Sequence, residues 1–131
     1  MDFFDTLTRI EDQPKYRIRS KWDNRVVDFE DGRQVMNSAK EGNPPSQLWA
    51  IFETSTGIKI MNIFGKDLLQ ATGQGIYEWT HDESTRVLLD SKGTGKALRR
   101  GKKKKDGALI GGWNYKPYKL QNKYVFELIE Q

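Results

Sequence analysis

The most concentrated charge in this sequence is a basic run from Lys92 to Lys105, which holds eight lysines and arginines and no acidic residue. Such a run could bind an anionic partner, namely a nucleic acid, a sulfated polysaccharide or an anionic lipid surface. The alternative interpretation is a solvated hairpin tip, because four consecutive lysines cannot all pack. The candidate anion-binding residues are Lys96, Arg99, Arg100, Lys102, Lys103, Lys104 and Lys105.

Residue types that support catalysis are scarce. The sequence has one histidine, His81, and no cysteine, so a His/Cys metal cluster cannot form and nucleophilic catalysis has few options. Acidic neighbours such as Asp82 and Glu83 have the residue types of a glycosidase pair, but acids commonly gather in turns. The stretch 93–96 (Gly-Thr-Gly-Lys) lacks the first glycine of a phosphate-binding loop. We therefore expect a binding protein rather than an enzyme, without a metal ion or cofactor.

The elements that must position these residues are short strands. Apolar residues alternate with polar ones in many brief segments, and Gly, Pro, Asn and Asp separate them, which is typical of β-structure. In the run 47–52 this alternation directs Trp49 and Ile51 into a core, and Asp31-Gly32 predicts a hairpin turn. The runs 86–90 and 124–128 follow the first at intervals of about 38 residues. Three closing strands at one spacing predict three similar units of four strands each.

The length of 131 residues suits one domain, and the content of Trp, Tyr and Phe argues against disorder. We expect an N-terminal arm at 1–14 and a single domain at 15–131, with units at about 15–54, 57–91 and 95–131. No apolar run is long enough for a transmembrane segment. The N-terminus carries acids where a secretory signal carries bases, so we expect a cytoplasmic protein. The basic run resembles a nuclear-import signal, which makes a nuclear location an alternative for a eukaryotic source.

Twelve strands in three groups predict an all-β domain closed on itself, with pseudo-threefold repetition, and the arrangement resembles a β-trefoil. The stretch 27–49 is similar to a ricin-B-type lectin repeat, which has an Asp after a short apolar pair and a closing Gln-x-Trp. In the second unit the Gln-x-Trp is absent, although 77–82 resembles the aromatic-then-polar element of that family. The run 76–79 predicts the third strand of this unit, and the polar stretch His81 to Ser84 predicts a loop before the closing strand. In the third unit Phe126 replaces the Trp. A lipocalin-type or oligonucleotide-binding barrel would share the strand content but not the recurring closing strands.

The resemblance implies a carbohydrate-binding module that recognises a glycan. A carboxylate or amide would take paired hydrogen bonds from sugar hydroxyls, and an aromatic face would cover the apolar side of the ring. The residues that match the family pattern are Asp28, Asn43 and Gln47 in the first unit, and Trp79, His81 and Asp82 in the second. Each site is incomplete, because the first lacks a stacking aromatic near Asn37 and the second has a leucine in place of the Asp. In β-trefoil growth factors a basic loop of the third unit binds heparin, so binding of anionic polymers through Lys92 to Lys105 is the alternative function.

Overall fold

The computed structural model describes residues 10–71, 73–116 and 122–131. Within these ranges the regular structure consists of β-strands and three short 3-10 turns, which confirms the predicted all-β class. The strands are β1 (Tyr16–Ser20), β2 (Val26–Glu30), β3 (Arg33–Asn37), β4 (Trp49–Glu53), β5 (Ile58–Asn62), β6 (Trp79–Asp82), β7 (Val87–Asp90), β8 (Lys96–Arg100), β9 (Ala108–Asn114) and β10 (Phe126–Glu130). The 3-10 turns are η1 (Ile10–Asp12), η2 (Pro45–Gln47) and η3 (Asn122–Tyr124).

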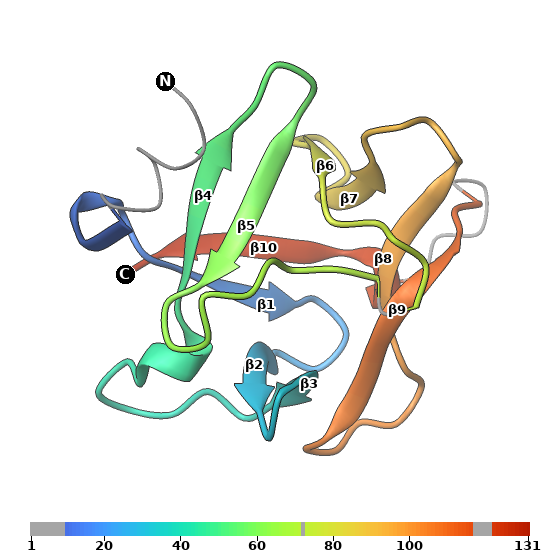
Figure 1. Ribbon diagram of the computed structural model, residues 1–131. Coiled ribbons are helices and arrows are strands. Elements are labelled where there is room, and N and C mark those ends of the chain that lie inside the picture. Colours follow the sequence, from blue (N-terminus) through green and yellow to red (C-terminus); the bar gives the residue numbers. More distant parts are fainter. Residues whose placement is uncertain (1–9, 72, 117–121) are drawn as a thin grey trace.

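All described strands belong to one antiparallel sheet that closes into a barrel-like form (Figure 1). The order is β10-β1-β2-β3-β9-β8-β7-β6-β5-β4, and a further pairing joins β4, at the end of that series, to β1 near its start. β1 pairs along its full length with β10, so the N-terminal and C-terminal strands lie side by side. Closure of this kind removes the open edges that would otherwise favour aggregation.

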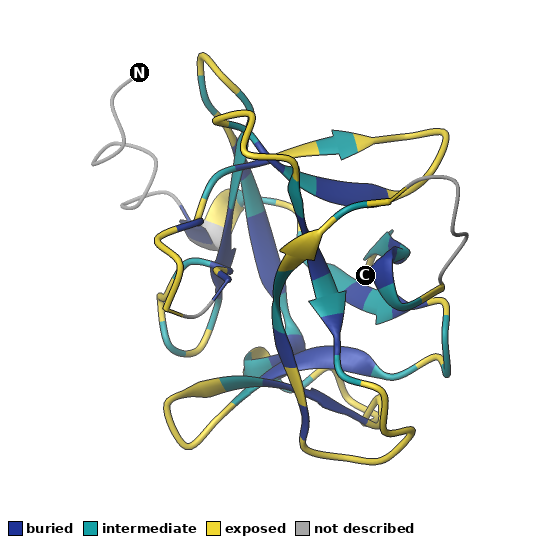
Figure 2. Cartoon of the chain, turned by 90° about the vertical axis from the view of Figure 1, so that its right-hand side faces the viewer, coloured by how far each residue is buried: buried dark blue, intermediate teal, exposed yellow. Residues whose placement is uncertain are grey.

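The predicted hairpin at Asp31-Gly32 is confirmed. β2 pairs with β3 over five residue pairs, and Asp31 and Gly32 have φ angles of 51° and 74°. A two-residue turn with both central φ angles positive matches the twist of the strands that flank it, and Asp and Gly tolerate that conformation best. Hairpin tips such as this one are exposed, whereas the strands that lead into the barrel are buried (Figure 2).

Two tryptophans and a phenylalanine occupy the centre of the core. Trp49, Trp79 and Phe126 are each fully buried at the first residue of a strand. The indole N–H of Trp49 donates to the Val27 carbonyl at 3.1 Å, and that of Trp79 donates to the Leu69 carbonyl at 3.1 Å. Each large aromatic side chain removed from water contributes about 2 kcal/mol or more to stability. The prediction of Trp49 as a core residue is confirmed.

One sequence expectation is corrected in the second half of the chain. The stretch His81 to Ser84 was expected to form a loop, but His81 and Asp82 belong to β6, where they pair with Leu88 and Val87 of β7. Trp79 therefore starts one arm of a hairpin instead of the third strand of a unit. The polar side chains gave the appearance of a loop because outward positions of a strand are free to be polar.

Most of the expected N-terminal arm, residues 1–9, lies outside the described residues. The part that is described is held against the barrel, because Ile10 of η1 is buried in a small cluster with Ala50, Phe52 and Met61. Among the described residues, no helix is long and apolar enough to cross a membrane.

Candidate ligand-binding sites

The carboxylate that matches the lectin repeat, Asp28, is 3% exposed on β2. Its Oδ2 accepts hydrogen bonds from Asn37 Nδ2 at 2.9 Å and from Gln47 Nε2 at 3.2 Å. Burial acts to raise the pKa of Asp28, but hydrogen bonds from Asn37, Ser46 and Gln47 outweigh it and leave the pKa below its usual value. Asp28 is therefore an ionised carboxylate whose protein donors already hold it.

This carboxylate is covered by the loop between β8 and β9. Asn37 stands near the place where the family carries its stacking aromatic, and its Oδ1 accepts from the Gly107 backbone N–H at 2.9 Å. Next to it, the Ser38 backbone N–H and hydroxyl both donate to Asp106 Oδ1 at 2.9 Å. These contacts place the loop over the Asp28 side chain, so a sugar has no direct route to it in this conformation.

The other two first-unit candidates take different roles. Gln47 is fully buried, and besides Asp28 it binds the Ser38 carbonyl at 3.0 Å and accepts from the Lys40 backbone N–H at 3.0 Å. It fixes the 38–47 loop. Asn43 lies exposed in that loop with a φ of 49°, which favours Asn, and it makes no hydrogen bond to Asp28. The structure thus brings Asp28 and Gln47 together but leaves Asn43 outside the cluster.

The second-unit candidates do not form one site either. The role of Trp79 as an exposed stacking platform is wrong, because its ring is fully buried. His81 lines a shallow groove of about 480 Å³ with Thr54 and Glu83. Asp82 is turned away into the β6–β7 turn, where it accepts from the backbone N–H and hydroxyl of Ser84, and these bonds lower its pKa.

The basic run divides into residues with different surroundings. Arg100 is fully buried and forms an ion pair with Asp23, so its expected role in binding an external anion is wrong. Lys96 donates to the Gln74 side chain at 3.2 Å. The remaining candidates, Arg99 and Lys102 to Lys105, are exposed or half-buried.

A more enclosed hollow, which we call the hairpin pocket, has a volume of about 470 Å³. It lies between the β2–β3 turn, residues 67–70 with Gln74, and β9. Its apolar lining includes Phe29, Leu109 and Trp113, and its polar lining includes Arg33, Asp67 and Gln70. Leu109 and Trp113 are 64% and 39% exposed, which is unusual for such large apolar groups.

Two glutamines hold the walls of the hairpin pocket in place. Gln34 of β3 donates to the Gln70 carbonyl at 3.0 Å and accepts from the Gln70 backbone N–H at 2.9 Å. Gln74 donates to the Gly112 carbonyl of β9 at 3.0 Å. Within the described part of the chain, the side chains of Arg33, Asp67 and Gln70 make no hydrogen bond, so their polar atoms are free for a ligand. Sequence reasoning missed this pocket, because its lining comes from three segments that only the fold joins.

A third hollow also has Trp113 in its lining. It measures about 420 Å³, and its lining includes Arg99, Lys102, Lys116 and Lys123. Lys116 and Lys123 lie outside the basic run, so the sequence alone did not connect them with it. Among the described residues no group of acidic or histidine side chains is arranged to hold a metal ion.

Comparisons with known proteins show that the fold is similar to solved structures, whereas the sequence similarity is low. No protein-family model matches the sequence, and no curated protein matches it. The C-half of the earthworm R-type lectin, in complex with GalNAc, is similar in structure with a TM-score of 0.72 and 16% identity, over 90% of this chain and 99% of that one. The Macrolepiota procera ricin B-like lectin, in complex with lactose, gives a TM-score of 0.73 and 13% identity over 89% and 95%. A designed threefold-symmetric protein, ThreeFoil, gives 0.73 and 13% over 89% and 99%. The chain therefore has a β-trefoil fold of the ricin-B type.

Proposed function

We propose that this protein is a non-catalytic, lectin-like module that binds a glycan in the hairpin pocket. The fold supports the proposal, since two proteins that share it are lectins in complex with GalNAc and lactose. The observation that carries it is the pairing, in one hollow, of exposed apolar surface on Trp113 and Leu109 with the free polar groups of Asp67 and Gln70. A sugar offers the matching surfaces, with an apolar C–H face and neighbouring hydroxyls.

The hairpin pocket suits this task better than the site that the lectin repeat indicates. The Oδ2 of Asp28 already accepts from Asn37 and Gln47. Its Oδ1 has no hydrogen-bond partner among the described residues, but it is buried, so a ligand hydroxyl could reach the carboxylate only if the surrounding contacts opened. Opening them would leave buried polar groups without partners, which destabilises the protein. Asp67 and Gln70 have no such partners to give up, and the glutamine contacts of the pocket walls reduce the ordering that binding requires.

We propose that the fold has a pseudo-threefold repeat with units at about 16–53, 58–82 and 87–130. Three observations support these boundaries in place of equal spacing. Trp49, Trp79 and Phe126 are all fully buried at the start of a strand, although 30 residues separate the first two and 47 the last two. The buried residues of equivalent preceding strands also correspond, namely Ile18, Ile60 and Leu88, and then Val27, Leu69 and Leu98. The middle unit is the shortest, so its two central strands are reduced to isolated bridges.

A glycan array followed by titration of the best ligand tests the proposed function. Trp113→Ala and Asp67→Ala should each weaken binding by about tenfold or more, which corresponds to the loss of a stacking contact or a charge-assisted hydrogen bond. Tyr77→Ala is the matched control, since Tyr77 is also an exposed aromatic residue at 41% but does not line the pocket. Unchanged affinity in both pocket variants, or binding lost only in Asp28→Asn, would contradict the assignment.

A further inference from the structure

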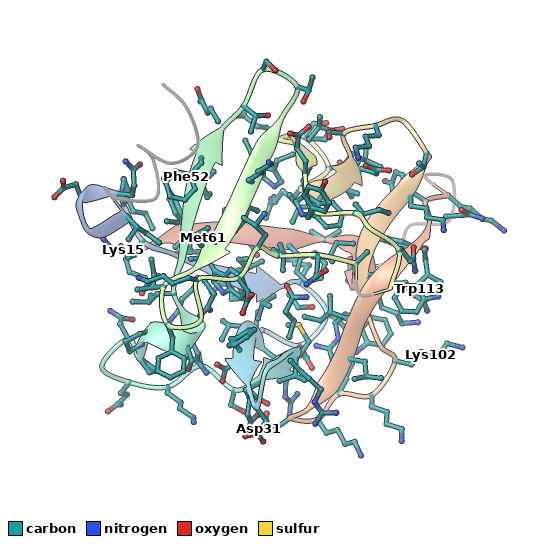
Figure 3. All side chains as sticks on the ribbon, viewed as in Figure 1. Lys15, Asp31, Phe52, Met61, Lys102 and Trp113 are labelled. Carbon is teal, nitrogen blue, oxygen red and sulfur yellow. The ribbon has the colours of Figure 1, made fainter. Side chains whose placement is uncertain are left out.

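The hollow beside Trp113, which we call the cationic pocket, gathers four positive charges from separate parts of the fold. Arg99 comes from β8, Lys102 from the β8–β9 loop, Lys116 follows β9, and Lys123 lies in η3. Trp113, Asn114 and Tyr124 also line it, and none of the described lining residues is acidic. Figure 3 shows Lys102 and Trp113 on the same side of the molecule, next to the β8–β9 hairpin.

These four charges are not neutralised within the described residues. Four arginines elsewhere in the fold form ion pairs, since Arg19 and Arg86 contact Glu127, and Arg25 and Arg100 contact Asp23. Arg99, Lys102, Lys116 and Lys123 form no ion pair with a described acidic residue. Like charges held close together repel one another, so an anion in the pocket would relieve that repulsion.

Arg99 is the most firmly positioned of the four. Its guanidinium carbon lies 4.7 Å from the centre of the Trp113 ring and 5.8 Å from that of Tyr124, which are cation–π distances. Its Nε is buried and has no hydrogen-bond partner. A buried donor without an acceptor is costly, and an anionic oxygen entering the pocket would satisfy it.

Lys123 supports the same conclusion. Its ammonium lies 4.5 Å from the centre of the Trp22 ring, on the side of the molecule where Lys104 approaches the same ring at 4.9 Å. Desolvation lowers the pKa of Lys123, and repulsion from Arg99 and Lys102 lowers it further. The pKa of Lys123 thus reflects its cationic neighbours, as expected where several positive charges lie close together.

We propose that the cationic pocket binds the acidic group, a sulfate or a carboxylate, of an acidic glycan whose neighbouring sugar ring lies in the hairpin pocket. Trp113 lines both hollows, so one ligand can contact both at once. The inference rests on the proposed function, and it gives the substrate class. A sugar acid suits the geometry better than a nucleic acid, because the charges surround one hollow of about 420 Å³ instead of following an extended groove.

Paired titrations test this inference. The best neutral oligosaccharide from the array is compared with its sulfated and its carboxylated counterparts and with a single-stranded oligonucleotide. The intact protein should prefer one acidic counterpart over the neutral sugar by about tenfold at low salt, and the preference should decline as salt is added. Which counterpart binds more tightly identifies the acidic group. No preference for either would overturn the inference, and so would tighter binding of the oligonucleotide than of every sugar.

The variants separate a defined pocket from diffuse charge. Arg99→Gln and Lys123→Gln should each remove the acidic preference, measured as the ratio of the two affinities. In Lys123→Gln, whose ammonium lies over the Trp22 ring, the affinity for the neutral sugar should change less than twofold. Lys105→Gln removes the same charge from the basic run, but Lys105 is exposed and does not line the pocket, so the preference should persist. An equal loss in Lys105→Gln would overturn the inference.

A further measurement keeps this inference distinct from the proposed function. Sodium sulfate alone should shift the indole N–H resonance of Trp113 in the intact protein, and Arg99→Gln should abolish that shift. If the neutral sugars fail to bind while the sulfate shift is present, the proposed function fails and the anion site stands. If the neutral sugar binds and sulfate produces no shift, the anion site is overturned alone.

Discussion

At the scale of single residues, Asp28 shows how one neighbouring side chain changes the role of a residue that matches a sequence motif. Gln47 donates to Asp28, as a repeat with both residues suggests. Asn37 donates to the same oxygen and also to Glu30 Oε2 at 2.8 Å, so an amide fills the space where the family places an aromatic face. The carboxylate becomes an interior anchor for β2, β3 and the β8–β9 loop.

Asn37→Ala should therefore affect stability and its pH dependence. The substitution removes donors to Asp28 and an acceptor for Gly107, and we expect a loss of about 1–3 kcal/mol in the free energy of unfolding. The folded-state pKa of Asp28 is lowered, so its contribution is present above the unfolded pKa and is lost as pH falls through the folded value. In the variant that pKa rises, and the loss should begin at higher pH. Urea unfolding between pH 3 and 7 measures this.

Asp28→Asn provides the control for that experiment. It keeps the shape of the side chain and removes the titrating group, so the acid-induced loss should become smaller than in the unmodified protein. A pH profile for Asn37→Ala that matches the unmodified protein would show that Asn37 does not support the ionised carboxylate.

Sequence reasoning could anticipate only part of this residue-scale picture. The pairing of Asp28 with Gln47 was foreseeable, because the repeat links an Asp to a closing Gln. The cover over Asp28 was not, since Asp106 and Gly107 lie about 70 residues from Ser38 and Asn37 in sequence. Contacts at that separation depend on how the strands close, which local patterns do not determine.

At the scale of elements, the β8–β9 loop is tethered by a buried cation. Besides its ion pair with Asp23, Arg100 donates to the Gly101 carbonyl at 3.2 Å and to the Lys103 carbonyl at 2.5 Å. Burial lowers the pKa of Arg100, and Asp23 acts in the opposite direction. Arg100 thus organises from the inside the same loop whose lysines face solvent.

Asp23→Asn should destabilise the protein more than Arg100→Met. The first change leaves a fully buried guanidinium without its carboxylate, and breaking a buried pair in this way costs about 3–5 kcal/mol. After the second change Asp23 still contacts Arg25 at 2.8 Å, so no charge is left unpaired. Urea unfolding of both single variants and the double variant measures the coupling. Additive effects, or a larger loss in Arg100→Met, would contradict this account.

Some strands could be predicted from the sequence and others could not, for a physical reason. Turns that need positive φ angles favour particular residues such as Asp31 and Gly32, so the β2–β3 hairpin could be predicted from the sequence. β6 could not, because His81 and Asp82 are polar, and a strand with one solvent-facing side resembles a loop in composition. The hairpin pocket and the cationic pocket were beyond prediction, since each joins three segments.

At the scale of the whole molecule, closure of the sheet matters more than equal spacing of its parts. The all-β barrel could be predicted from strand content and from the closing aromatic residues. With the unit boundaries that we propose, the second closing residue is Trp79 and not Leu88 of β7, and the middle unit is shorter than the expected interval of about 38 residues. Deletions in hairpins that lie outside the barrel shorten the sequence period and leave the packing of the barrel intact.

Trp79→Phe and Trp49→Phe test whether these two tryptophans have equivalent positions in the fold. Each indole N–H donates at 3.1 Å to the carbonyl of a fully buried residue, Val27 for Trp49 and Leu69 for Trp79, so each substitution removes the indole donor from that carbonyl. We expect similar losses of about 1–3 kcal/mol in the free energy of unfolding. In the intact protein, hydrogen exchange followed by NMR should show both indole protons protected and that of Trp113 exchanging rapidly. Rapid exchange of the Trp79 indole proton, together with an unchanged free energy of unfolding for Trp79→Phe, would instead show that Trp79 is exposed and could stack on a sugar. Protection at both positions would leave the stacking role to an exposed aromatic residue, and Trp113 is the one that lies exposed in the lining of the hairpin pocket.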